Sequence, residues 1–230
     1  MRWDERQAKV KELSYQSIDE LSDEFNLDLP FYPEVYWIGR SLDFDYLGLP
    51  SKLRDEFDDR FSLRLSSYFR DQGVILINKY RRHDIFEEST HFLHLINSGI
   101  EMDDSLRNGL WKNVFIEMLG FFGARFLGSS AINGYGTSDL MKYYSPESDS
   151  FDFSSDNIYE DDFNYESFFS DFIYQQGYHL GEVLFFKFIN GKISRREISN
   201  MFGDNLRGSS NAREKVLELR SKFWPVKKQF

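Results

Sequence analysis

The sequence predicts an α+β fold dominated by helices: a single domain in which a small sheet packs on the helix expected at residues 83–98. Three segments, at 83–98, 105–128 and 163–189, have the length and apolar content of long helices. Two shorter runs, at 34–39 and 74–78, are rich in β-branched and aromatic residues, which favour strands. The chain has 230 residues, of which 41% are hydrophobic and 24 are Phe, so it can bury one sizeable core.

The N-terminal half is expected to contain the sheet and two further helices. Residues 4–25 have sparse apolar positions and precede two prolines, which indicates a polar helix that ends before them. The strand at 34–39 follows, and residues 51–60 begin with a Ser that can cap a short helix. The segments 63–69 and 74–78 flank the turn-like sequence Arg-Asp-Gln-Gly, which predicts an antiparallel hairpin.

The C-terminal half is expected to be a long loop followed by three helices. Residues 129–162 are rich in Ser, Gly, Asn and Asp and lack a helical period, which predicts a flexible acidic loop. The aromatic helix at 163–189 contains two glycines four positions apart, which suits close packing on another helix, and Asn190-Gly191 ends it. Ser194 can cap a helix that reaches Phe202, and a basic helix is expected at 210–223.

Charge and composition exclude several classes of protein. The net charge of −10 argues against a nucleic-acid binder, because phosphate binding draws mainly on Lys and Arg. The chain has no Cys, which excludes disulfides, thiolate metal ligands and cysteine nucleophiles and fits a reducing compartment. No run approaches 18 apolar residues, and the first residues lack the apolar stretch of a signal peptide. We therefore expect a cytoplasmic protein that binds neither nucleic acid nor membrane.

The helix expected at 83–98 has ionisable groups at the spacing of metal ligands. At about 100° per residue, Glu87, Glu88, His91, His94 and Leu95 fall within an arc of about 120°, and most of the apolar side chains share the opposite side. In the zinc motif H-E-x-x-H, two His at i and i+4 hold the metal and the intervening Glu is the general base. Here Glu87 stands where the first His belongs. The alternative is an ordinary solvated helix face.

One carboxylate, Glu117, stands alone in the apolar stretch 111–125. That stretch is apolar on all sides, which predicts burial, and a buried carboxylate costs several kcal/mol unless a partner compensates it. No cation of its own helix lies three or four positions away, so the partner must come from elsewhere. Two alternatives remain open: a metal ion, or a hydrogen bond from a backbone group or an arginine such as Arg107 or Arg81.

The pattern Glu87-Glu88-x-x-His91-x-x-His94, followed by Glu117 in Glu-Met-Leu-Gly-Phe-Phe-Gly, resembles the core of the gluzincin zinc metallopeptidases, particularly the small archaeal minigluzincin-like proteins. That family places a strand before the motif helix and takes a third zinc ligand, a Glu, from the next helix. The strand would be 73–78. The resemblance covers about residues 65–128. The sequence departs from the family pattern at Glu87, where the family has a His.

The resemblance implies a role for each matching residue. His91 and Glu117 are the implied metal ligands, Glu88 is the implied general base, and Glu87 occupies the position of the missing ligand His. Two carboxylates and one imidazole form a harder, oxygen-rich donor set than the usual catalytic zinc sites. We therefore expect zinc, with manganese or iron as alternatives, and without metal at least one carboxylate should hold a proton.

The chain then divides into three parts. Residues 1–128 comprise the N-terminal helix, the small sheet and the metallopeptidase-like core. Residues 129–162 form the acidic flexible loop, of which 145–162 should be mobile or should cover the Glu88 and His91 face as a lid. Residues 163–230 supply C-terminal helices that pack on the same core.

Three functions remain open at this point. The first is a degenerate gluzincin-like, metal-dependent hydrolase acting on peptides or proteins, active or latent. The second is a catalytically dead protein that uses the same fold for binding or regulation. The third is a ferritin-like di-iron helical protein, because Glu88-x-x-His91 also fits an E-x-x-H motif. That fold needs a second E-x-x-H, which the sequence lacks.

Overall fold

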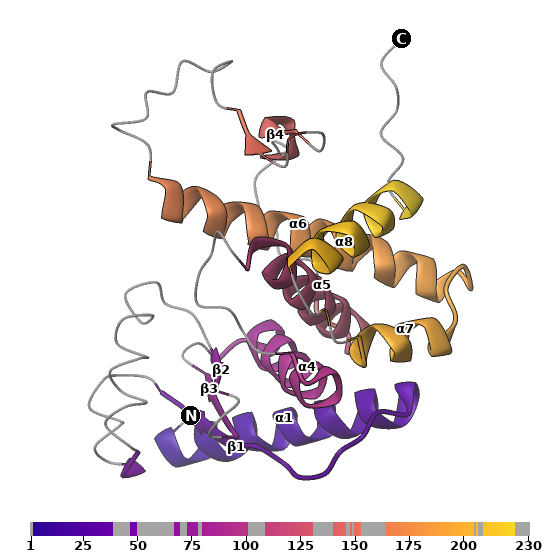
Figure 1. The fold of residues 1–230 in the computed structure, drawn as a ribbon. Helices are drawn as coiled ribbons and strands as arrows, with labels where there is room; N and C mark the ends of the chain where they lie inside the picture. Colours follow the sequence, from indigo (N-terminus) through magenta and orange to yellow (C-terminus); the bar gives the residue numbers. More distant parts are fainter. Residues whose placement is uncertain are drawn as a thin grey trace.

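The predicted α+β class is confirmed. A computed structural model describes residues 2–38, 47–49, 67–69, 73–77, 80–100, 109–130, 140–145, 148, 150–152, 164–204, 206 and 209–223. Within these residues, six α-helices, a three-stranded sheet and a two-stranded sheet form a single domain (Figure 1). No helix in this part of the chain has the length and apolarity needed to cross a membrane.

The elements follow one another largely where they are expected. In chain order they are α1 (Trp3–Phe25), β1 (Glu34–Trp37), β2 (Ser67–Phe69), β3 (Val74–Ile77), α4 (Arg82–Ser98), α5 (Leu110–Phe126), a 3₁₀ turn (Leu140–Tyr143), β4 (Tyr144–Ser145), β5 (Ser150–Phe151), α6 (Tyr165–Ile189), α7 (Arg195–Phe202) and α8 (Ser209–Phe223). The helix expected at 51–60 lies outside the described residues, as do 105–108 of the helix expected at 105–128.

The helix ends have local causes. Gly99 adopts a left-handed conformation with φ 65°, and its N–H bonds to the carbonyl of Leu95, which stops α4. Gly191 also has φ 65°, in the predicted stop after α6. Ser194 forms a capping box with Glu197 at the start of α7, as its sequence position predicts.

The larger sheet has the order β1-β3-β2 and is covered on both sides. β2 pairs antiparallel with β3, which confirms the hairpin, and β1 pairs parallel with β3. Ile75 and Ile77 face the main core with the helices, whereas Val74 and Leu76 belong to a smaller apolar cluster on the other side. Burial on both faces explains why β3 is apolar at every position.

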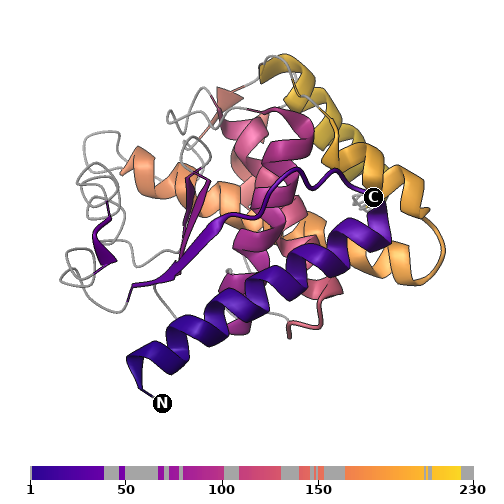
Figure 2. The ribbon, with the colours of Figure 1, turned by 90° about the horizontal axis from the view of Figure 1, so that it is seen from below.

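The helices are layered around α5. In Figures 1 and 2, α1 runs along the outside of α4, α4 lies against α5, and α6 lies against the opposite side of α5. α1 also contacts β1, and α4 contacts β2 and β3, so the sheet packs on the predicted motif helix. α7 and α8 close the side of this layered arrangement. The two central helices, α4 and α5, are therefore covered by protein on most sides.

The expected loop at 129–162 contains short regular structure. A 3₁₀ turn leads into β4, which pairs antiparallel with β5. Phe151 of β5 packs edge-on against Phe168 and Phe172 of α6, and Tyr144 of β4 packs on Trp111 of α5. Aromatic contacts with distant helices therefore order a hairpin that has no local sequence signal. Residues 146–147, 149 and 153–162 lie outside the described part of the chain, so the mobile or lid-like behaviour of 145–162 stays a prediction.

Glycines let α6 approach α5 closely. A Cβ on Gly177 would collide with Glu117 Cβ and lie 3.1 Å from the backbone nitrogen of Met118. A Cβ on Gly181 would lie 2.7 Å from the carbonyl oxygen of Met118. The two glycines expected to favour close packing do so, and they bring α6 against the backbone of α5 at Glu117.

Substitution of Gly177 by Ala tests this contact. Alanine favours a helix over glycine by about 1 kcal/mol, but the new methyl group has no space, and overpacking typically costs about 1–3 kcal/mol. We expect Gly177→Ala to lower the free energy of unfolding in urea. Gly203→Ala is the control, because a Cβ there has no neighbour closer than 3.8 Å. Equal stability of the two variants would contradict the close approach.

Candidate metal centre

The ionisable face of α4 is buried. Glu88 and His91 are each 8% exposed, and His94 is fully buried. The interpretation of this face as an ordinary solvated surface is therefore wrong. The reason is tertiary: α5 covers the side of α4 that periodicity alone would leave to water.

Glu117 projects from α5, which is buried along most of its length. Every residue of α5 from Asn113 to Ala124 is buried, and the Glu117 side chain is 12% exposed. Its oxygen Oε2 lies 3.7 Å from Nε2 of His91 on α4. The partner that the sequence requires for this carboxylate is thus supplied by the neighbouring helix.

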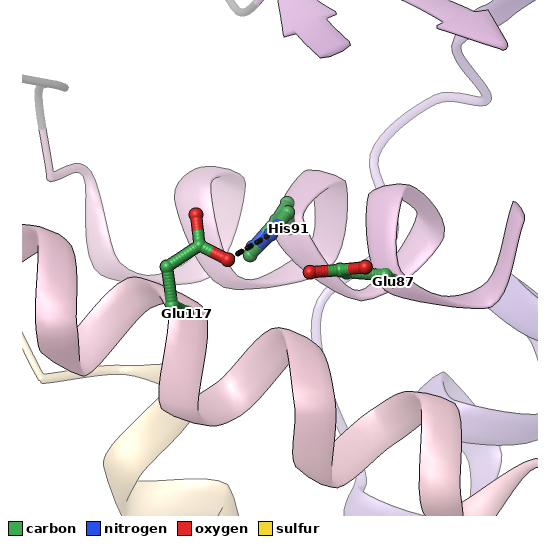
Figure 3. Close-up of side chains that lie close together, drawn as sticks. All are labelled: Glu87, His91 and Glu117. Carbon is green, nitrogen blue, oxygen red and sulfur yellow. Dashed lines mark ion pairs between the residues drawn. The ribbon is translucent and has the colours of Figure 1, made fainter. Parts of the chain in front are cut away.

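Three candidate ligands converge between α4 and α5. Glu87 and His91 are one turn apart on α4, and Glu117 reaches toward them from α5 (Figure 3). One ligand atom from each residue lies within 4.8 Å of the other two. In Figure 3 one carboxylate oxygen of Glu87 is directed toward His91 and Glu117, and the other is turned away. These three residues could hold a metal ion.

The centre has unsatisfied polar atoms and close helix packing. Within the described part of the chain, His91 Nδ1 and Glu117 Oε2 are buried without a hydrogen-bond partner. Buried polar atoms are normally paired, so these two atoms are compatible with a partner that the described residues do not supply. Gly120 of α5 faces the imidazole: a Cβ there would lie 2.8 Å from His91 Nε2. Glycine at this position thus makes room for the ring of His91.

The charges of the three residues are strongly interdependent. Burial disfavours the charged imidazole, but the carboxylates of Glu117, Glu88 and Glu87 outweigh it and raise the pKa of His91 to about 9. Burial raises the pKa of Glu117, against the opposing charge of His91. Burial would also raise the pKa of Glu87, yet hydrogen bonding and the charge of His83 bring it below its ordinary value. His91 is therefore protonated at neutral pH when no metal is present.

Glu88 lies next to the centre. Burial is the main cause that raises its pKa to about 8; the charge of His91 opposes this rise, and the neighbouring carboxylates add to it. Glu88 therefore holds a proton at pH 7 in the metal-free protein, as expected for a site with several carboxylates.

His83 is a further functional candidate, which the motif pattern of α4 did not single out. Its Nε2 lies 3.1 Å from Oε2 of Glu87, and its Nδ1 lies 2.9 Å from the hydroxyl of Ser129. His83 precedes Glu87 by four positions and His91 by eight, so the three share one helix face. This spacing was the available signal.

The arginines near the site are engaged with other acids. Arg81 pairs with Asp84 at 2.8 Å, and Arg125 pairs with Glu182 of α6 at 2.6 Å. Arg81 is therefore wrong as the partner of Glu117, and Arg107 lies outside the described residues. His91 is the described side chain that neutralises Glu117.

His94 turns away from the ligand cluster into the aromatic core. Its ring packs near Phe115 of α5 and Phe202 of α7, with centroid distances of 5.7 and 6.1 Å. Both ring nitrogens are buried without a hydrogen-bond partner in the described part of the molecule. Burial, followed by the positive charge of His91, lowers the pKa of His94 to about 3. His94 is thus a neutral core residue and does not join the candidate centre.

Comparisons with known proteins found no match for this chain. No protein-family model matches the chain, no curated protein matches it, and no solved structure matches it.

The buried His94 should make the protein sensitive to acid. Because folding lowers its pKa, its contribution to stability is present above about pH 6.5 and is lost as the pH falls toward 3. His94→Leu removes the ring that takes up the proton. The variant therefore avoids this acid-induced loss of unfolding free energy, which amounts to about 1.4 kcal/mol per pH unit below 6.5. Urea unfolding at pH 7 and pH 4.5 should show the variant gaining stability relative to the parent on acidification. A constant difference between the two proteins would contradict this assignment.

Proposed function

We propose that this protein binds a divalent transition metal through Glu87, His91 and Glu117 and uses it as a hydrolase resembling the gluzincins. The observation that supports this most directly is the convergence of three ligand atoms from two helices within 4.8 Å. Buried acids and a buried imidazole are costly to fold, and a dication shared between them offsets that cost. Glu117 Oε2, which has the 3.7 Å ion pair with His91 Nε2 but no hydrogen-bond partner in the described part of the chain, fits such a role.

The donor set suggests which metal the centre would take. One imidazole and two carboxylates suit zinc and also the harder manganese and iron ions. No thiolate contributes, because the chain has no Cys. Zinc is the proposed metal on the strength of the resemblance, with manganese and iron as the alternatives that the oxygen-rich donors favour.

The side chains of the centre have separate proposed roles. Glu87, His91 and Glu117 would hold the ion, which when bound supplies Lewis acidity toward a carbonyl oxygen. Glu88, the proposed general base, would accept a proton from water at its carboxylate. Its raised pKa, about 8, lies near the operating range of such a base. A peptide substrate is proposed from the resemblance alone.

A second function is favoured by one specific observation. The side chains of Glu87, His91 and Glu117 are only 10–13% exposed, so the site is shielded from solvent. Glu87, at the place of a ligand His in the resemblance, is also in contact with His83. A structural or regulatory metal centre without turnover fits such a shielded site. The third candidate, a ferritin-like di-iron protein, is disfavoured by the missing second E-x-x-H and by the three-stranded sheet.

Metal binding is the first property to test. His91→Ala and Glu117→Gln each remove one donor, so each should weaken Zn²⁺ binding more than about 100-fold, which exceeds the usual effect of losing a residue that only orients a ligand. Titration calorimetry on chelator-treated protein measures the Kd. Glu12→Gln, at an exposed carboxylate of α1 paired with Lys9, should leave it unchanged. A folded parent that binds none of Zn²⁺, Mn²⁺ and Fe²⁺ would end the proposal.

Restoring the missing histidine separates the hydrolase from its alternatives. Glu87→His should tighten Zn²⁺ binding at least about tenfold, because imidazole replaces a carboxylate where negative charge is in surplus. The paired variant, Glu88→Gln, should keep the parent's Zn²⁺ affinity but lose about 10²- to 10⁴-fold in hydrolysis of a quenched-fluorescence peptide library. Hydrolysis that survives Glu88→Gln would reject Glu88 as the base. If neither the Zn²⁺-loaded parent nor the Zn²⁺-loaded Glu87→His variant hydrolyses any peptide, the result favours the non-catalytic function.

A further inference from the structure

His83 contacts Glu87 from outside the ligand cluster. The ring is 8% exposed and belongs to the same helix face as Glu87 and His91. Its Nε2 lies 3.1 Å from Glu87 Oε2, within hydrogen-bonding distance. His83 is not one of the residues whose ligand atoms gather within 4.8 Å. Its position is therefore that of a neighbour of the ligand.

The second nitrogen and the face of the His83 ring also have neighbours. Nδ1 lies 2.9 Å from Ser129 Oγ, just beyond the end of α5, and the ring packs against Phe121 of α5 at a centroid distance of 5.5 Å. The carbonyl of Ser129 in turn accepts a hydrogen bond from Arg125, which pairs with Glu182 of α6. A continuous series of polar contacts thus connects Glu87 to α6.

These contacts constrain how Glu87 can act as a ligand. Metal ligands generally depend on outer partners that orient them, and loss of such a partner typically costs about 10–100-fold in metal affinity. With Oε2 engaged by His83, Glu87 would offer a metal one oxygen rather than two. Each nitrogen of His83 already faces another residue: Nε2 lies 3.1 Å from Glu87 Oε2, and Nδ1 lies 2.9 Å from Ser129 Oγ.

From these contacts we infer that His83 is a positioning residue, which orients Glu87 as a one-oxygen ligand and is itself aligned by Ser129. This inference rests on the proposed metal centre. It also accounts for the departure at Glu87: a carboxylate that replaces a ligand His is supported by a His one turn earlier on the helix.

Co²⁺ is the probe for this inference, because its visible absorption reports the number and kind of ligands. His83→Leu keeps an apolar side chain against Phe121 but removes both nitrogens. We expect it to weaken Co²⁺ binding about 10–100-fold and to change the absorption spectrum, because Glu87 is free to bind through both oxygens. His83→Gln returns an N–H donor near the position of Nε2 and should restore most of the affinity and the spectrum.

Each outcome decides the inference. A folded His83→Leu with the parent's affinity and spectrum would overturn it while leaving the metal centre intact. A loss equal to that of His91→Ala, without rescue by His83→Gln, would make His83 a direct ligand and also overturn it. A parent that binds no Co²⁺ would reject the metal centre itself, and the inference with it. If His83→Leu does not fold, Ser129→Ala serves instead: a weaker affinity supports the inference, and an unchanged one overturns it.

Discussion

The arrangement of the molecule depends on how closely three helices approach one another. α5 lies between α4 and α6, and glycines stand at both contacts: Gly120 and Gly123 face α4, and Gly177 and Gly181 of α6 face α5. A side chain at any of these positions would collide with a neighbour. The consequence for the site is direct, because the backbone of α5 at Glu117 is pressed against α6 while the carboxylate extends toward His91.

Close packing of this kind excludes water, so a buried charge lowers the stability of the fold unless it is paired. The buried acids are paired in two ways. Asp84 and Glu182 are each paired with an arginine, so their charges are neutralised by permanent cations. Glu117 and Glu87 are instead paired with histidines, whose charge depends on protonation. A cluster that relies on protons for its neutrality can exchange them for a dication, which is the physical basis of the proposed metal centre.

The same cluster bears on the choice between catalysis and binding. A gluzincin-like hydrolase needs a base beside the metal, and Glu88 has the expected place in the motif and a raised pKa. A shielded metal centre without turnover needs only the three ligands and their outer support, which His83 and Ser129 supply. Both functions need Glu87, His91 and Glu117, and they differ in whether Glu88 acts as a base on a substrate.

Much of the local structure was determined by the sequence alone. Length and apolar content predicted α4 and α6, Ser194 and Gly191 marked helix ends, and the turn sequence before Val74 predicted the β2–β3 hairpin. These signals act over a few neighbouring residues, so they do not require the rest of the fold. The buried position of Glu117 and its need for an outside partner were also evident, because an isolated charge in an apolar helix must be compensated.

Only the tertiary structure decided which groups meet. Sequence periodicity placed Glu87, Glu88, His91 and His94 on one face, but packing brought His91 to Glu117 and turned His94 toward Phe115. It also buried a face that could have been solvated, joined His83 to Ser129, and ordered β4 and β5 through aromatic contacts with α5 and α6. Such pairings join residues far apart in the chain, and their geometry follows from how whole helices fit together, which no local pattern encodes.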